Sequence, residues 1–406
     1  MERKSFIARF AFIGVAVGAL LCVSPTLAAI TFTRQVLVGD VGATGAQEVR
    51  ALKLDGDAAL FFNAGGSEYL LQRQGSSWIQ STIYSSGPST APGAAIYMDA
   101  TIAADGTPYV GIGYRSPGGS GSGFTNGVRI LDRVAGSWKT VFNQSGSDHY
   151  GGSIAMGTVN GAPVATYTGN GAASSGFSST AKFLELNGST WQESQLGLPN
   201  NGGITHLEVG QIGSKPTVLV DTDGGFGAFL DQRSGATWTA TNVPVANGSG
   251  ALLGNSTQPQ FFEGGSIGGA VFTQSGSTLS LQQLAPGPSH IVGSDFEVIN
   301  GVLTAIYDNN GSIHFAQFLS GAWTDQIIDQ GSISWEDGIS LVDLNGHAGI
   351  AYVDDRPSGA HSLVWLEAPA VVGTTVPLPN AALAGIACLP VVALALRRSK
   401  RTVAPV

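Results

Sequence analysis

Residues 300–328 read NGVLTAIYDNNGSIHFAQFLSGAWTDQII and contain one complete copy of a unit that recurs in weaker form along most of the chain. The turns Asn300-Gly301 and Asn310-Gly311 and a third turn at Gly321 separate short runs of β-branched and aromatic residues. Asn-Gly supplies the positive φ angles that tight hairpins need, and β-branched and aromatic side chains fill the pleats of a strand. The stretch therefore predicts a three-strand meander with strands at 302–307, at 313–319 and after Gly321.

The same spacing of turns is found elsewhere in the chain. First-hairpin turns are expected at seven places: Asp55-Gly56, Asp105-Gly106, Asn160-Gly161, Gly213-Ser214, Gly264-Gly265, Asn300-Gly301 and Asn345-Gly346. A later turn in five of these units places a tryptophan shortly after a glycine, at Trp78, Trp138, Trp191, Trp238 and Trp323. A tryptophan buries about 150–250 Å², so these side chains are expected to pack between adjacent sheets rather than to form ligand platforms. The unit at Gly265 lacks such a tryptophan and is predicted to be the least regular.

Repeated small antiparallel sheets of this size predict an all-β fold, a β-propeller that spans residues 29–368. We expect seven blades; six blades, with the unit at Gly265 folded elsewhere, is the alternative. After residues 361–367 the chain supplies no final strand, whereas residues 30–38, ITFTRQVLV, match the final-strand pattern of 322–328. The N-terminal strand is therefore predicted to complete the last blade and close the ring, which hides both sheet edges.

Composition restricts the function classes. The 406 residues include 58 glycines and 12% charged residues, which suits a turn-rich β protein. Setting aside the seven basic residues near the termini and Glu2 leaves 12 basic and 27 acidic residues, a net charge of −15. Such a charge repels polyphosphate, so nucleic acid is not expected as a partner. Cys22 and Cys388 lie in the terminal apolar segments, so the globular part has no disulfide and no thiolate chemistry.

Residues 1–28 have the pattern of a signal peptide. The first nine residues are basic, residues 10–23 are apolar, and Ala28 offers a small residue at the cleavage position. At about 1.5 Å per residue the apolar run is shorter than the ~30 Å hydrocarbon core, which disfavours a retained anchor.

The C-terminal residues form a second targeting pattern. Residues 369–380 form a linker with the motif VPLPN at 376–380, residues 381–396 are apolar and predict a hydrophobic helix, and residues 397–406 begin with the basic cluster RRSKR. This arrangement resembles the PEP-CTERM sorting signal of exported bacterial proteins, although Leu378 stands where that family usually has glutamate and Pro390 interrupts the helix. The positive-inside rule keeps the basic tail cytoplasmic and the main body outside. The resemblance implies a membrane-embedded exosortase that cleaves near the proline motif; a plain C-terminal anchor is the alternative.

The propeller topology predicts where ligands bind. Loops between the second and third strands and loops between successive blades share one face, and polar candidates on that face are His149, Tyr150, Asp221, Asp223, Trp335, Glu336, Asp337, Asp354, Asp355, Arg356 and His361. Trp335 with Glu336 and Asp337 has the residue types that stack on a sugar and bind its hydroxyls; packing between blades is the alternative. Asp354, Asp355, Arg356 and His361 suit an acid/base cluster or, alternatively, an ion-paired loop.

Two further patterns are weaker. Asp221 and Asp223 resemble the start of a calcium loop, but no glutamate follows at the required spacing and aspartate before glycine is an ordinary turn residue. The recurring Gly-x-x-Trp turns resemble part of the Asp-box of sialidase-like propellers, but the upstream serine and aspartate are absent, so that activity does not transfer. We expect no cofactor, with calcium as the alternative.

These observations predict an exported cell-surface or matrix protein, transiently anchored in the membrane by its C-terminal helix. We expect a non-enzymatic propeller that binds glycan or protein ligands, with polysaccharides, surface proteins and an exosortase-type enzyme as partners. A secreted polysaccharide hydrolase or lyase that uses acidic residues of the loop face is the alternative, and a purely structural propeller stays open. An enzyme should gather two or three acidic or histidine side chains in one pocket.

Overall fold

The computed structural model describes residues 30–41, 48–85, 95–116, 125–145, 153–169, 180–198, 204–222, 227–243, 250–253, 260–263, 270–275, 278–284, 291–333, 338–356 and 361–369. These residues form seven antiparallel sheets of four strands each. All the strands belong to one compact unit that begins at Thr31. The prediction of an all-β propeller is confirmed.

The first four sheets follow the chain without interruption. Sheet 1 contains β2 (Val49–Leu54), β3 (Asp57–Ala64), β4 (Ser67–Gln74) and β5 (Ser77–Ser85), and sheet 2 contains β6 (Ala95–Ile102), β7 (Pro108–Ser116), β8 (Thr125–Val134) and β9 (Ser137–Ser145). Sheet 3 contains β10 (Ile154–Val159), β11 (Ala162–Gly169), β12 (Thr180–Asn187) and β13 (Thr190–Gln195), and sheet 4 contains β14 (Ile204–Ile212), β15 (Lys215–Thr222), β16 (Ala228–Ser234) and β17 (Thr237–Val243).

The last three sheets include the shortest strands and the closure. Sheet 5 contains β18 (Gly250–Leu252), β19 (Gln260–Glu263), β20 (Ala270–Ser275) and β21 (Thr278–Gln283). Sheet 6 contains β22 (Ile291–Ile299), β23 (Val302–Asn309), β24 (Ser312–Leu319) and β25 (Ala322–Gln330). Sheet 7 contains β26 (Ile339–Asp343), β27 (Ala348–Asp354), β28 (Ser362–Glu367) and β1 (Thr33–Val38).

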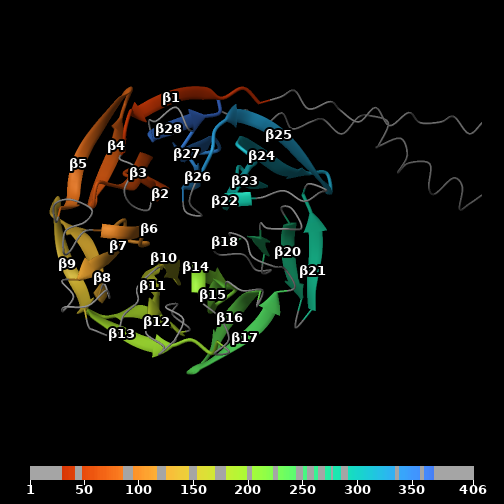
Figure 1. Ribbon diagram of the computed structural model, residues 1–406. Coiled ribbons are helices and arrows are strands. Elements are labelled where there is room, and N and C mark those ends of the chain that lie inside the picture. Colours follow the sequence, from red (N-terminus) through yellow and green to blue (C-terminus); the bar gives the residue numbers. More distant parts are fainter. Residues whose placement is uncertain are drawn as a thin grey trace, which may run out of the picture. The chain divides into compact units, whose positions relative to one another are not determined.

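The first strand of every sheet lies on the inside of a closed succession. Contacts link β2 to β6, β6 to β10, β10 to β14, β14 to β18, β18 to β22, β22 to β26, and β26 back to β2. Figure 1 shows these strands nearest the centre and the fourth strands β5, β9, β13, β17, β21 and β25 on the outside, with β1 in the equivalent place of sheet 7. The inner strands therefore surround a common axis.

The N-terminal strand closes the succession as the sequence predicts. β1 pairs antiparallel with β28, with Thr33 opposite Glu367 and Val36 opposite Val364. β1, from the N-terminal part of the folded unit, thus completes a sheet whose other three strands come from the C-terminal part of that unit. This arrangement covers the edge of β28 and couples the two ends of the folded unit.

The turns fulfil their prediction at the positions that the structure describes. The pairs Asp55-Gly56, Asn160-Gly161, Asn300-Gly301 and Asn345-Gly346 all have positive φ at both residues, as a two-residue hairpin requires. One prediction was incomplete. The sequence predicts three strands for the unit that begins at Asn300, whereas sheet 6 also contains β22, which precedes the turn and pairs with β23. Residues 293–295, GSD, interrupt the apolar residues of this inner strand, so its strand pattern is less evident in the sequence than that of the other three.

The tryptophans pack between sheets, as predicted. Four tryptophan rings contact an aromatic ring of another sheet. The ring centroids are 5.4 Å apart for Trp78 and Trp365 of sheet 7, and 6.3 Å apart for Trp138 and Phe61 of sheet 1. They are 6.1 Å apart for Trp191 and Tyr109 of sheet 2, and 4.9 Å apart for Trp238 and Phe183 of sheet 3. Each of these tryptophans contacts the preceding sheet of the ring. Trp323 has its ring contacts with Phe296 and Phe318 of its own sheet, and it packs against the apolar cluster between sheets 5 and 6. The core is therefore a series of apolar clusters between neighbouring sheets.

The two predicted targeting segments and the predicted terminal helices lie outside the described residues. Over the part of the chain that the structure does describe, no helix has the length and apolar character needed to cross a membrane.

Candidate functional site

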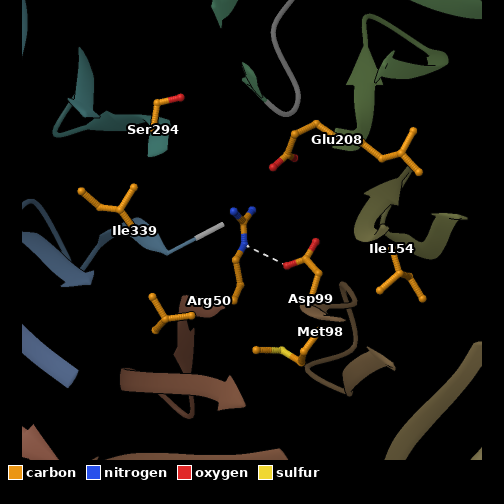
Figure 2. A pocket seen from close by; sticks show the side chains of 9 residues that line it. Arg50, Met98, Asp99, Ile154, Glu208, Ser294 and Ile339 are labelled. Atoms are coloured by element: carbon orange, nitrogen blue, oxygen red, sulfur yellow. Dashed lines mark ion pairs between the residues drawn. The ribbon is translucent and has the colours of Figure 1, made fainter. Parts of the chain in front are cut away.

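A pocket lies on the inner side of the sheets, between the start and the middle of the inner strands. Six inner strands contribute its lining: Val49 and Arg50 of β2, Met98 and Asp99 of β6, Ile154 of β10, Leu207 and Glu208 of β14, Ser294 of β22, and Ile339 of β26. Figure 2 shows Arg50 in the middle of this group, with Asp99 beside it and Glu208 and Ser294 across from it. We call this the axial pocket.

Strand pairing places part of the axial pocket lining near the face on which the sequence analysis predicted ligand binding, the face of the second-to-third and inter-sheet loops. Val49 lies opposite Phe62, Ile154 opposite Tyr167, and Ile339 opposite Tyr352. Each partner stands at the end of a second strand, shortly before the connection to the third. These lining residues therefore lie at the level of the strand ends that carry the second-to-third loops, but inner strands rather than loops build the pocket.

Arg50 is the central polar group of the axial pocket. Its Nε lies 3.5 Å from Asp99 Oδ1 and its Nη1 lies 3.5 Å from Asp295 Oδ2, and 28% of the side chain is exposed. Burial lowers the pKa of the Arg50 guanidinium, but the carboxylates of Asp295 and Asp99 outweigh it and hold the pKa above its ordinary value. Arg50 is therefore charged. A guanidinium has five N–H donors. The buried Nε donor of Arg50 makes no hydrogen bond with the described residues.

The two carboxylates that flank Arg50 also tie neighbouring sheets together. Asp99 Oδ2 accepts a hydrogen bond from the Met156 amide of sheet 3 at 2.6 Å. Asp295 Oδ2 accepts from the Leu341 amide of sheet 7 at 2.8 Å and from Ser340 Oγ at 3.0 Å. Inner strands are sheet edges with free N–H groups, so these bonds satisfy donors that would otherwise be buried without a partner. Asp99 and Asp295 thus stabilise the contacts between sheets independently of any ligand.

Two more carboxyl groups, those of Glu297 and Glu208, lie near Arg50. Burial raises the pKa of Glu297 above its ordinary value, while the hydrogen bond from the Val298 amide and the charge of Arg50 oppose that rise. Glu208, which lines the pocket itself, lies 3.9 Å from His206 Nε2. One guanidinium therefore faces several carboxyl groups.

The size of the axial pocket limits what it can hold. The cavity volume is about 20 Å³. A cavity needs roughly 10–15 Å³ to hold one water molecule on this measure, so the pocket accepts a group of about that size and not a whole sugar ring. A larger ligand would place one protruding polar group in the pocket.

The predicted cluster around Asp354 is brought together by the end of β27. Arg356 Nε lies 2.9 and 2.8 Å from the two carboxylate oxygens of Asp354, and His361 Nδ1 pairs with Asp355. Arg34 of β1 lies 3.6 Å from the same Asp354 and binds Asp329 of β25 at 2.7 Å. These contacts are those of an ion-paired loop that links sheets 6 and 7, and the acid/base role stays a prediction.

Other predicted site residues are placed apart or fall outside the description. Asp221 is buried on β15 with 1% of its surface exposed. The remaining candidates, His149, Tyr150, Asp223, Trp335, Glu336 and Asp337, lie outside the described residues. In the strands and turns that are described, no group of three or more His, Cys, Asp or Glu side chains is arranged to hold a metal ion. The calcium hypothesis therefore stays a prediction.

The residues of the axial pocket were missed because the sequence search favoured loops. A signal did exist. A charged residue stands five or six positions before several first-hairpin turns: Arg50 before Asp55, Asp99 before Asp105, Glu208 before Gly213, and Asp295 before Asn300. Charges recurring at one position of otherwise apolar inner strands would have pointed to the axis.

Comparisons with known proteins agree on the fold. No family model matches the chain, and no curated protein matches it either. Among solved structures, the chain is similar to a protein of unknown function from Dyadobacter fermentans, with 11% identity, a TM-score of 0.51 and coverage of 82% of this chain and 98% of that one. It is also similar to the Hadza microbial sialidase Hz136, with 12% identity, a TM-score of 0.50 and coverage of 80% and 65%. The SapL1 lectin in complex with alpha methyl fucoside follows at 14% identity, a TM-score of 0.46 and coverage of 71% and 98%. At 11% and 12% identity the first two likenesses show the propeller fold alone, and the third, with a TM-score of 0.46, adds no argument.

Proposed function

We propose that this protein is exported to the cell surface or the extracellular matrix and that its propeller binds a glycan without cleaving it. The observation that carries the binding half of the proposal is the axial pocket. A charged guanidinium there has a buried donor without a hydrogen-bonded acceptor, and carboxyl groups stand beside it. Sugar hydroxyls both donate and accept hydrogen bonds, so they suit a site that offers both kinds of partner.

Hydrolysis is the second candidate and has its own supporting observation. Several carboxyl groups gather near the axis, and Glu297 has the raised pKa that a general acid requires. Two observations favour binding instead. Asp99 and Asp295 already accept amide hydrogen bonds from neighbouring sheets. A cavity of about 20 Å³ also leaves no room for a sugar ring whose scissile bond lies between two carboxyl groups.

Glycan-array binding by the purified full-length chain tests the proposal. Saturable binding that falls at least tenfold in Arg50→Met supports the axial pocket as the site. Arg34→Met is a matched control, because it removes an arginine that is also ion-paired to aspartate but lies on β1. Trp335→Ala and Asp354→Ala examine the loop residues that the sequence selected. No binding to any glycan would refute glycan recognition, and release of reducing ends from a bound polysaccharide would favour the hydrolase.

The export half of the proposal rests on residues 1–28 and 369–406. We propose that the signal peptide directs the chain out of the cytoplasm and that an exosortase-type enzyme processes the C-terminal segment near Pro377 and Pro379. An epitope placed before residue 370 should then appear at the surface or in the medium, whereas one placed after residue 400 should be lost. Retention of both epitopes in the membrane would favour a plain anchor, and retention in the cytoplasm would refute export.

A further inference from the structure

We infer that the axial pocket selects an uncharged, hydroxyl-bearing end group of a glycan and rejects a carboxylated one. This inference rests on the proposed function and adds the chemical class of the group that enters. Its physical basis is the balance of charge around Arg50 together with the small volume of the cavity.

The charge around the pocket opposes an anionic ligand. Asp99 and Asp295 each lie 3.5 Å from the Arg50 guanidinium, and Glu208 lines the same pocket. One positive group and three carboxyl groups give a formal charge of −2 when all are ionised. A ligand carboxylate placed against Arg50 would meet these carboxyl groups at short range, where the surrounding protein screens charge poorly.

The hydrogen-bonding groups are complementary to hydroxyls. Arg50 supplies N–H donors and no acceptor, whereas an ionised carboxylate supplies acceptors and no donor. Figure 2 shows Arg50 with Asp99 beside it and with Glu208 across the pocket. A hydroxyl between them accepts from the guanidinium and donates to a carboxylate, and a pair of adjacent hydroxyls does so twice. A carboxylate group has no hydrogen to donate.

The shape of the pocket selects the end of a chain. Inner strands of sheets 1, 2, 3, 4, 6 and 7 surround the cavity, and its volume is about 20 Å³. Because the cavity is enclosed by strands on these sides, an internal sugar residue with chain on both sides does not fit down the axis. A terminal residue presents a hydroxyl or a hydroxymethyl group that does.

The test uses pairs of glycosides that differ in a single group. Methyl galactoside is compared with methyl galacturonoside, and methyl glucoside with methyl glucuronoside, by titration calorimetry against the wild-type chain at neutral pH. We expect the better neutral glycoside to bind at least tenfold more tightly than its uronate partner. Glu208→Gln should weaken the neutral glycoside and reduce the discrimination several-fold, because it removes one negative charge without changing the shape of the side chain.

Arg50→Met and Arg50→Lys complete the test. Met removes the donors and Lys keeps the charge, so we expect loss of neutral binding with the first and partial retention with the second; thermal melting shows whether each variant is folded. If the uronate binds more tightly, or if Glu208→Gln leaves the discrimination unchanged, the inference is wrong while glycan binding stands. If no glycoside and no array glycan binds, both the proposed function and this inference are wrong.

Discussion

Replacing Glu68 by glutamine should remove one component of the pH dependence of this protein's stability above pH 4.5. Glu68 lies on β4 of sheet 1 with no exposed surface, and neither carboxyl oxygen forms a hydrogen bond with a described residue. Burial alone raises the pKa of this carboxyl group well above its ordinary value of 4.5. The folded protein therefore keeps Glu68 protonated under conditions in which the unfolded chain releases the proton.

The sign and size of the effect follow from this difference in bound protons. The contribution is fully present below the unfolded pKa and is lost as the pH rises toward the folded pKa. Over that window the unfolded state binds one proton fewer, so the free energy of unfolding falls by about 1.4 kcal/mol per pH unit. Glutamine does not titrate, so the Glu68→Gln variant should lack this slope.

Urea denaturation between pH 4 and 8, followed by tryptophan fluorescence, measures the effect. The difference in unfolding free energy between Glu68→Gln and wild type should grow in favour of the variant as the pH rises. Asp55→Asn replaces a carboxyl group in an exposed turn by an amide and controls for the loss of one titrating group. Glu68→Met removes the unsatisfied polar group as well and should stabilise the protein at neutral pH by about 1–3 kcal/mol. Parallel pH profiles for wild type and Glu68→Gln would refute the reasoning.

Three further substitutions test the contacts between sheets, each by denaturant unfolding. Gly157→Ala should destabilise the protein by about 1–3 kcal/mol, because a Cβ at this position would lie 2.2 Å from the Val209 carbonyl oxygen of the next inner strand; an unchanged midpoint would show that the two strands separate freely. Trp238→Ala should cost about 3–5 kcal/mol through the cavity that it leaves between sheets 3 and 4, and a loss below 1 kcal/mol would contradict its packing role. Asp295→Ala should cost at least about 1–3 kcal/mol because the Leu341 amide loses its acceptor; a neutral result would mean that water replaces it.

Local sequence signals carried much of the fold because they act over a few residues. Asn-Gly pairs favour the positive φ angles of tight hairpins, and Asn300-Gly301 and Asn345-Gly346 adopt them. The turns and the strands beside them were therefore predicted from these pairs and the residue types around them. The match between residues 30–38 and the final strands likewise predicted that β1 pairs with β28. The inner strand β22 was missed, because residues 293–295, GSD, interrupt its apolar residues.

The site depended on contacts that no local pattern records. Arg50, Asp99, Glu208 and Asp295 stand far apart in the sequence, and only closure of the ring brings their inner strands to one axis. The loop cluster of Asp354 and Arg356 was found from the sequence, since its members are neighbours along the chain. The sequence by itself thus determined the repeated hairpins, the tryptophans between sheets and the strand that closes the ring, because each depends on short-range conformation and burial. The tertiary structure alone decided which charges meet, since electrostatic interactions depend on distance in space and not on separation along the chain.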